Sequence, residues 1–199
     1  PSVLATLVSD KLDFPNLSMV GVDDRAAAYQ AVSYLIQQGH RKIAVLGGPA
    51  TSYPSMMRRQ GAQQAMEDAG IRFEDKLYGL SNYDFESAYH AMNSLLARRA
   101  EFTALFAMSD VIAFGAIRAL VSAGFRVPQD VSVIGFDGIT MSRYCVPVMT
   151  TIVQPSEQIA LQSIELLINQ IEHGAPAQTI TLQPELQQGE SVCPCRHPL

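Results

Sequence analysis

The sequence predicts an α/β fold with a parallel sheet, on three observations. Short apolar, β-branched runs alternate with longer segments of helical periodicity at least four times along the chain. The run Val131–Phe136 has no polar alternation, which is typical of a strand covered by helices on both faces. A second run, Thr150–Val153, follows it without a helical segment between them and ends at Gln154 and Pro155. Two strand ends that each present a polar side chain, Asp137 and Gln154, are typical of two lobes that face a cleft.

The individual elements follow from local signals, taken in chain order. Asp23 and Asp24 are expected to cap a first helix, and Gly39 suits the left-handed position at its end. Proline is tolerated at a first helical position, so Pro155 is expected to open the last helix, which ends at Gly174. The other helices are expected at Ser55–Ala69, Asp84–Arg98 and Val111–Ala123. Strands are expected at Ser2–Val8, Leu17–Val22, Ile43–Leu46, Lys76–Leu80, Ala104–Ala107, Val131–Phe136, Thr150–Val153 and Thr179–Leu182.

These units are unevenly distributed along the chain. Between Ile43 and Phe136 lie four expected strands with three intervening helices, which make a nearly closed lobe. Before Gly39 there are only one or two strands and one helix, too little to bury a parallel sheet on both faces. We therefore expect the first lobe to be incomplete in this chain. The low charged fraction, 17%, and the mean hydropathy of +0.10 fit either a well-covered sheet or apolar surface that belongs against a missing piece.

Composition excludes several classes of function for this stretch. The net charge of −5 gives no electrostatic basis for binding nucleic acid. No apolar run approaches the roughly 18 residues that a membrane span needs. Three cysteines are an odd number, and Cys193 and Cys195 are too close together for a framework disulfide, which favours a reducing, cytoplasmic compartment. No histidine or cysteine cluster accompanies them, so we expect free thiols and no metal site.

The motifs of catalysis and cofactor binding are absent from the sequence. It contains no G-x-S-x-G nucleophile elbow, no G-x-x-x-x-G-K-[ST] phosphate loop and no G-x-G-x-x-G after a strand. None of the four histidines comes with a plausible nucleophile, and each is better explained as a cap or surface residue. We therefore expect neither an enzyme nor a cofactor.

Polar side chains do recur at the carboxyl ends of the expected strands. Ser109 and Asp110 follow one strand, Asp137 follows the next, and Tyr83 follows a third, while Arg58 lies on the helix after Ile43–Leu46. A guanidinium and a carboxylate on one rim can grip vicinal hydroxyls, and an aromatic ring can cover the apolar face of a sugar or base. The alternatives are structural, with both aspartates as caps, the arginine in solvent and the tyrosine in the core.

Five motifs together resemble the effector-binding core of the lactose/galactose-repressor family of bacterial transcription regulators. They cover nearly all of residues 19–190 in the order and spacing of that family. The motif most specific to the family is SDVIAFGAIRALVSAGFRVPQDVSVIGFDG. The motifs are VGVDDRAAAYQAV, LIQQGHRKIAVLGGP, RRQGAQQAMEDAG, SDVIAFGAIRALVSAGFRVPQDVSVIGFDG and TTIVQP.

The resemblance implies a periplasmic-binding-protein-like fold of two Rossmann-like lobes with parallel sheets and an effector in the cleft between them. It assigns the first, partial lobe to residues 1–40 and 152–174, the second to 41–151 and 175–190, and a tail to 191–199. Where the family often has GFDD, this chain has GFDG, so Gly138 replaces a possible second carboxylate. The implied effector contacts are Arg58, Tyr83, Ser109 with Asp110 beside it, Asp137, Gln154 and, where relatives often carry an aspartate, Thr6.

The resemblance also implies a mechanism. A small effector, most simply a sugar and otherwise a nucleoside or base, would favour one lobe arrangement. That arrangement would alter operator binding by a helix-turn-helix head that is not in this chain, in a homodimer without membrane contact. The hinges are expected near His40–Lys42, Thr150–Gln154 and Gly174–Ala177.

Two other classes of protein share this architecture. A periplasmic sugar-binding receptor of an ABC transporter would carry a signal peptide in its full-length gene instead of a helix-turn-helix. A doubly wound enzyme would lose turnover in an Asp137→Ala variant, whereas a sensor would lose only its ligand-induced change.

Overall fold

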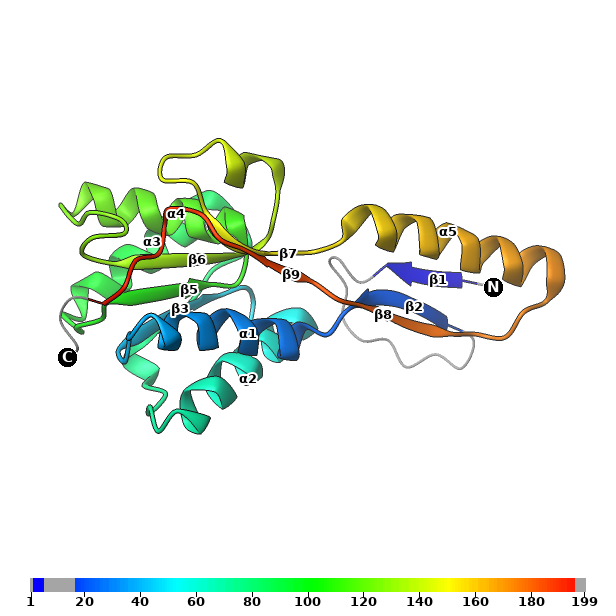
Figure 1. Ribbon diagram of the computed structural model, residues 1–199, viewed down its shortest axis with the longest axis horizontal. Coiled ribbons are helices and arrows are strands. Elements are labelled where there is room, and N and C mark those ends of the chain that lie inside the picture. Colours follow the sequence, from blue (N-terminus) through cyan, green and yellow to red (C-terminus); the bar gives the residue numbers. More distant parts are fainter. Residues whose placement is uncertain (1, 6–16, 196–199) are drawn as a thin grey trace.

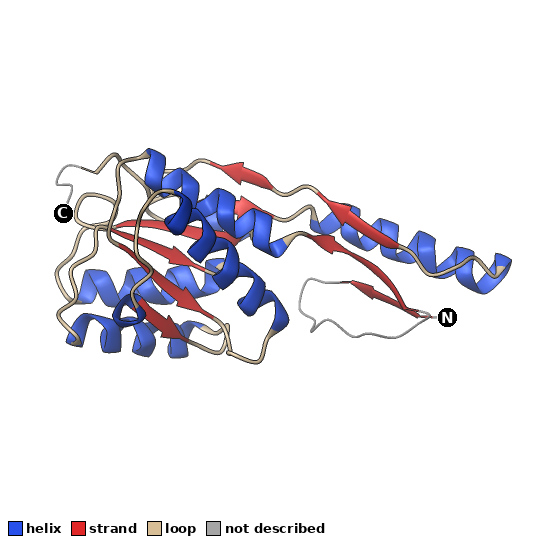
Figure 2. Cartoon of the chain, turned by 90° about the horizontal axis from the view of Figure 1, so that it is seen from below, coloured by secondary structure: helices blue, strands red, loops and turns tan. Residues whose placement is uncertain are grey.

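The chain forms two lobes of unequal size that lie end to end along the long axis of the molecule (Figures 1 and 2). The computed structural model describes residues 2–5 and 17–195. The larger lobe contains a six-stranded sheet of order β4-β3-β5-β6-β7-β9, and the smaller lobe a three-stranded sheet of order β1-β2-β8. The expected α/β fold with parallel sheets is confirmed, since every strand pair is parallel except β7 with β9.

The large-lobe sheet is buried on both faces, as its apolar strands predict. All residues of β3 and β5 are buried. The helices α1 (Asp24–Gln37) and α2 (Tyr53–Asp68) cover one face, and α3 (Phe85–Ala97) and α4 (Asp110–Ser122) the other (Figure 1). The strands are β3 (Ile43–Gly47), β4 (Tyr78–Leu80), β5 (Ala104–Ala107), β6 (Ser132–Asp137), β7 (Thr150–Val153) and β9 (Glu185–Gln187). Two 3-10 turns complete the lobe, η1 (Asp75–Leu77) and η2 (Thr140–Arg143).

Small residues let the helices of each pair approach closely. A Cβ added to Gly61 of α2 would lie 2.0 Å from the carbonyl oxygen of Arg25 in α1. In the other pair, a Cβ added to Gly115 of α4 would lie 2.5 Å from the carbonyl oxygen of Phe85. The start of α2, and with it Arg58, is therefore held against the start of α1.

The smaller lobe consists of β1 (Ser2–Ala5), β2 (Leu17–Val22), β8 (Thr179–Leu182) and the helix α5 (Ser156–His173). Val20, Ile159 and Leu166 form its apolar core, which joins α5 to one face of the sheet. The outward side of α5 carries large exposed hydrophobic side chains, which are Leu161, Ile164, Ile168 and Ile171. No helix in the described part of the chain is both long and apolar enough to cross a membrane.

The distribution of elements between the lobes differs from the one expected. The first helix, α1, packs against α2 and against β5, β6 and β7 in the large lobe, although residues 1–40 were expected in the first lobe. The strand β8 pairs with β2 in the small lobe, whereas 175–190 was expected in the second lobe. Residues of the expected tail are part of the large lobe, since the hydroxyl of Ser191 donates to the carbonyl oxygen of Val133 at 2.6 Å.

The chain passes between the described parts of the two lobes at three places (Figure 1). These passages are Val22–Asp24, Val153–Ser156 and Leu182–Glu185. Thr150–Gln154 borders one of them. The other two expected hinges are wrong, because His40–Lys42 connects elements within the large lobe and Gly174–Ala177 elements within the small lobe.

Candidate functional site

Arg58 lies between two carboxylates at the start of α2. Its side chain is only 3% exposed, and its Nε donates to Oδ1 of Asp24 at 2.7 Å. Its Nη1 donates to the carbonyl oxygen of Met108 and lies 3.6 Å from Oδ1 of Asp137. The guanidinium also stacks over the ring of Phe136, 3.7 Å from its centroid. The side chain is therefore held in one position before any ligand arrives.

Asp137 ends β6 and faces Arg58. Its backbone has a φ of 112°, a region that residues with a side chain rarely adopt, so the strand end is a local departure from regular geometry. The Nε2 of Gln154 donates to Oδ1 of Asp137 at 2.8 Å. Burial raises the pKa of Asp137, against the opposing effects of the Arg58 charge and the Gln154 hydrogen bond.

Asp24 is the member of this group that sequence reasoning missed. The side chain of Asp23 caps α1 by accepting from the backbone N–H of Ala26 at 2.9 Å. Asp24 is therefore free for another role, and its buried side chain, 8% exposed, pairs with Arg58. Burial raises the pKa of Asp24, and the charge of Arg58 opposes the shift. Two adjacent acids at a helix start that needs one cap were the signal available in the sequence.

Ser109 and Asp110 are directed into the large lobe. The hydroxyl of Ser109 accepts from the backbone N–H of Ile112 at 3.2 Å and caps α4. The fully buried Asp110 accepts from the Thr151 hydroxyl at 2.6 Å and the Ile139 N–H at 2.9 Å. Burial raises its pKa to about 6. Ser109 is thus the cap of α4, whereas Asp110 does not cap a helix and instead joins α4 to Thr151 of β7 and to Ile139.

Tyr83 covers the turn after β3. A Cβ added to Gly48 would lie 2.0 Å from the tyrosine ring, so the ring rests directly on that glycine. Its backbone has a φ of 60°, and its buried hydroxyl has no hydrogen-bond partner among the described residues. Thr6 lies outside the described residues.

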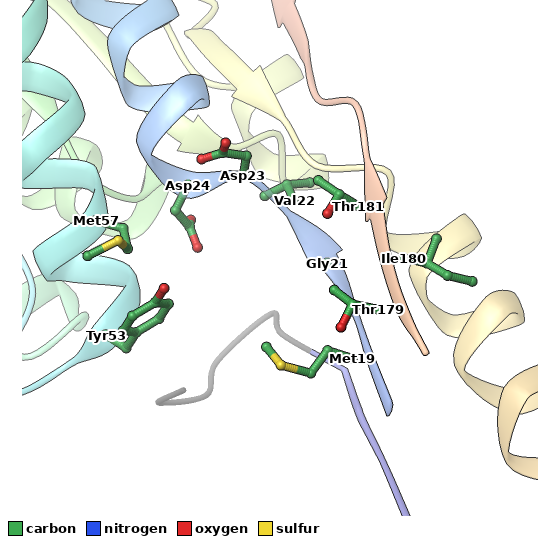
Figure 3. Close-up of a pocket in the computed structure, with 10 residues that line it drawn as sticks. All are labelled: Met19, Gly21, Val22, Asp23, Asp24, Tyr53, Met57, Thr179, Ile180 and Thr181. Carbon is green, nitrogen blue, oxygen red and sulfur yellow. The ribbon is translucent and has the colours of Figure 1, made fainter. Parts of the chain in front are cut away.

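Two cavities border three of these residues, Asp24, Asp137 and Gln154, whereas Arg58, Tyr83, Ser109 and Asp110 line neither cavity. The first, of about 280 Å³, lies between the lobes, and Figure 3 shows Tyr53 on one side, Met19 and Thr179 on the other, and Asp24 beside the opening. The second, of about 800 Å³, is lined by Asp137, Gln154 and residues at the start of α5.

The ion pairs of Arg58 with Asp24 and Asp137, here called the ion network, connect these two cavities. Asp24 lines the first cavity, Asp137 lines the second, and Arg58 joins them. Such a layer of hydrogen-bonding groups can recognise a small polar ligand. Within the described ranges, no three histidine, cysteine or acidic side chains are grouped to hold a metal ion.

Comparison with known proteins gives a consistent set of relatives. Residues 32–192 match the family model of a periplasmic binding protein-like domain. The chain is 37% identical over 174 residues to the HTH-type transcriptional regulator MalR of Clostridium butyricum, covering 87% of this chain and 52% of MalR. It is 36% identical over 172 residues to the HTH-type transcriptional repressor CytR of Escherichia coli strain K12, covering 86% of this chain and 50% of CytR.

A solved structure agrees with these relatives. The transcriptional regulator CelR in its complex with cellobiose superposes with a TM-score of 0.85 at 32% sequence identity. The match covers 89% of this chain and 54% of CelR. The chain thus spans about half the length of the curated relatives it matches.

Proposed function

The chain belongs to the periplasmic binding protein-like domain family and is related to the LacI-family transcriptional regulators, and on that premise we propose that it is the ligand-sensing domain of such a regulator. A small effector binds between the lobes and favours one arrangement of them. In the whole protein, that change alters how a helix-turn-helix head binds its operator. The relatives named above are regulators and not enzymes.

The observation that carries this proposal is the Asp24–Arg58–Asp137 network between two inter-lobe cavities. It concentrates fixed hydrogen-bonding groups where the two lobes meet and contains no nucleophile or general base with a partner for catalysis. The network offers both a donor and acceptors to a ligand hydroxyl. Because the positions of these groups are already fixed, little conformational freedom is lost when the ligand binds.

A sugar is the effector we propose, with a nucleoside or base as the second choice. Support comes from CelR, which was solved with cellobiose, and from the pairing of an arginine and an acid that suits vicinal hydroxyls. The proposed contacts are Arg58, Asp137, Gln154 and Tyr83, with Asp24 added. Ser109, Asp110 and Thr6 were also expected to contact the effector, and the first two would act here by positioning α4.

The position of the network also suggests how binding is coupled to lobe movement. Asp24 lies at the first passage between the lobes, and Gln154 lies at the second. A ligand that changes the hydrogen bonds of these residues acts directly on the segments about which the lobes would turn. Couplings of roughly 1–3 kcal/mol are enough for an allosteric switch.

The remaining parts of the proposal concern the whole protein. We propose a homodimer that works in the cytoplasm, as a regulator that reaches operator DNA requires. The acidic charge of this chain, −5, supports a DNA contact through another part of the protein.

The test is a ligand screen of the full-length regulator. Thermal shift against sugars, nucleosides and bases is expected to raise the melting temperature with at least one compound, because a ligand that binds only the folded state stabilises it. Calorimetry of that compound with an Arg58→Lys variant is expected to show a loss of affinity of at least about tenfold, since lysine cannot reproduce the fork of donors.

Arg59→Lys is the matched control, because the side chain of Arg59 is 41% exposed and pairs with Asp75. It should bind the compound as the natural protein does. A complete panel without a single stabilising compound would refute the proposed function.

A further inference from the structure

We propose that Asp24 makes the cleft reject anionic ligands, so that the protein binds a neutral polyhydroxy compound and not its phosphorylated or carboxylated counterpart. This selectivity presupposes that a ligand binds between the lobes, as proposed above. It deepens that function by naming the charge class of the effector and the residue that sets it.

The first step is the balance of charge around Arg58. One guanidinium faces two carboxylates, Asp24 at 2.7 Å and Asp137 at 3.6 Å. Asp110 adds a third buried acid close to Asp137. An arginine that is already compensated in this way cannot neutralise an incoming anion, which would instead meet two nearby carboxylates at short range in a poorly solvated site.

The second step concerns the hydrogen-bond donors of Arg58. Arg58 directs Nε to Asp24 and Nη1 to the Met108 carbonyl, so two of its five N–H donors are already committed within the protein. A phosphate or carboxylate offers only acceptors at neutral pH and depends on free donors. A ligand hydroxyl can instead donate to the oxygens of the two carboxylates.

The third step comes from the side-chain oxygen of Gln154, a neighbour of the Arg58 network. Gln154 is 5% exposed, its Nε2 donates to Asp137, and its Oε1 has no partner among the described residues. A buried acceptor without a partner is costly, and a ligand that donates an O–H or N–H to it recovers that cost. Gln154 thus also favours a donor-bearing ligand over an anion.

The described residues that line the two cavities also disfavour an anionic ligand. The first cavity is lined by Asp23, Asp24 and the hydroxyl-bearing Tyr53, Thr179 and Thr181, without a basic side chain among its described residues. In the second cavity the described lining includes one cation, Arg143, which is exposed to solvent that screens its charge.

The experiment compares neutral compounds with their anionic counterparts on the full-length regulator. The pairs are glucose and glucose 6-phosphate, ribose and ribose 5-phosphate, cellobiose and cellobionate, and adenosine and adenosine monophosphate. Thermal shift finds the pairs that bind, and calorimetry gives both dissociation constants. The natural protein is expected to bind the neutral member at least about 100-fold more tightly, as expected for like charges at short range.

The decisive variant is Asp24→Asn, which has nearly the same shape and keeps an oxygen that can accept from Arg58. It is expected to reduce the neutral-to-anionic preference by about tenfold or more, because one negative charge is removed. Asp75→Asn is the control, since it also removes one negative charge, its side chain is 92% exposed, and Asp75 lines neither cavity. It should leave the preference unchanged.

Each outcome decides a question. An anionic member that binds the natural protein as tightly as its neutral partner overturns the role of Asp24, as does an unchanged preference in a folded Asp24→Asn variant. If Asp24→Asn does not fold, the preference measured in the natural protein and in Asp24→Ser decides the matter. If no compound of either kind binds, the proposed function itself is rejected.

Discussion

At the scale of single residues, the stability of the site depends on Arg58. Its guanidinium is the counter-ion of Asp24 and lies 3.6 Å from Asp137, and the Asp24 and Arg58 side chains are more than 90% buried. Removing one member of a buried ion pair is strongly destabilising, because the partner remains buried without compensation. An exposed ion pair, by contrast, contributes little.

We expect Arg58→Ala to lower the free energy of unfolding by about 3–5 kcal/mol, because two acids lose their counter-ion. Urea unfolding followed by circular dichroism measures the change. The neighbouring substitution Arg59→Ala is expected to cost no more than about 1 kcal/mol, since its ion pair with Asp75 is exposed. Equal losses in the two variants would contradict a buried network.

Asp110 gives the stability of the large lobe a defined dependence on pH. Burial raises its pKa from 3.8 to about 6, so between these values the folded chain holds a proton that the unfolded chain has released. The free energy of unfolding therefore falls as pH rises through this window, and above pH 6 this group adds no further change. A shift of this size corresponds to about 3 kcal/mol.

The Asp110→Asn variant is expected to have a smaller slope, because asparagine does not titrate, while Asp24 and Asp137, whose pKa values burial also raises, still do. Urea unfolding at several pH values between 4.5 and 6.5 measures it. The control Asp75→Asn removes an acid whose side chain is 92% exposed and should keep the slope. An unchanged slope in Asp110→Asn would assign the pH dependence to other groups.

At the scale of elements, the close packing of α1 on α2 positions Arg58 beside Asp24. The contact depends on Gly61, because a side chain at this position would collide with the carbonyl oxygen of Arg25. Ala62 and Ala65 continue the buried seam along α2. A wider separation of these helices would break the ion pair at their starts.

We expect Gly61→Ala to cost about 1–3 kcal/mol of stability through overpacking and to weaken ligand binding at the same time. The gain in helix propensity, about 1 kcal/mol, opposes this cost and is too small to reverse it. Gln60→Ala, on the exposed side of α2, should change stability by less than about 0.5 kcal/mol. If Gly61→Ala is as stable as the natural protein, the helices are not in steric contact there.

At the scale of the whole molecule, the three passages between the lobes determine where movement can occur. Two of them carry Asp24 and Gln154, which belong to the hydrogen-bond network of the site. The expected hinges at His40–Lys42 and Gly174–Ala177 lie within single lobes. Lobe movement and ligand binding therefore share residues.

Hydrogen exchange measures this connection. Addition of a ligand found in the screen is expected to slow hydrogen exchange of the backbone amides at Val22–Asp24 and at Gln154 and Ser156. The ligand orders these segments between the lobes, and an ordered backbone exposes its amides to solvent less often. The amides of His40 and Gly174 serve as internal controls and should exchange as before. Protection at His40 without protection at Gln154 would restore the earlier assignment of the hinges.

Much of the architecture could be predicted from local patterns. The strands at Leu17–Val22, Ala104–Ala107, Thr150–Val153 and Thr179–Leu182 lie where their apolar runs predicted. The helix α2 begins two residues earlier than expected, at Tyr53, because Pro54 is tolerated in a first turn. The short strand β9 was missed, since ELQ has no apolar run to mark it.

The amino-acid sequence by itself determined the order of strands and helices, the parallel sheet and the family, because these follow from local periodicity, turn residues and contiguous motifs. Only the tertiary structure decided that α1 packs in the large lobe, that Asp110 turns inward and that Asp24 joins Arg58. Such pairings connect residues far apart in the chain, and they depend on which buried charges find partners when the elements pack together.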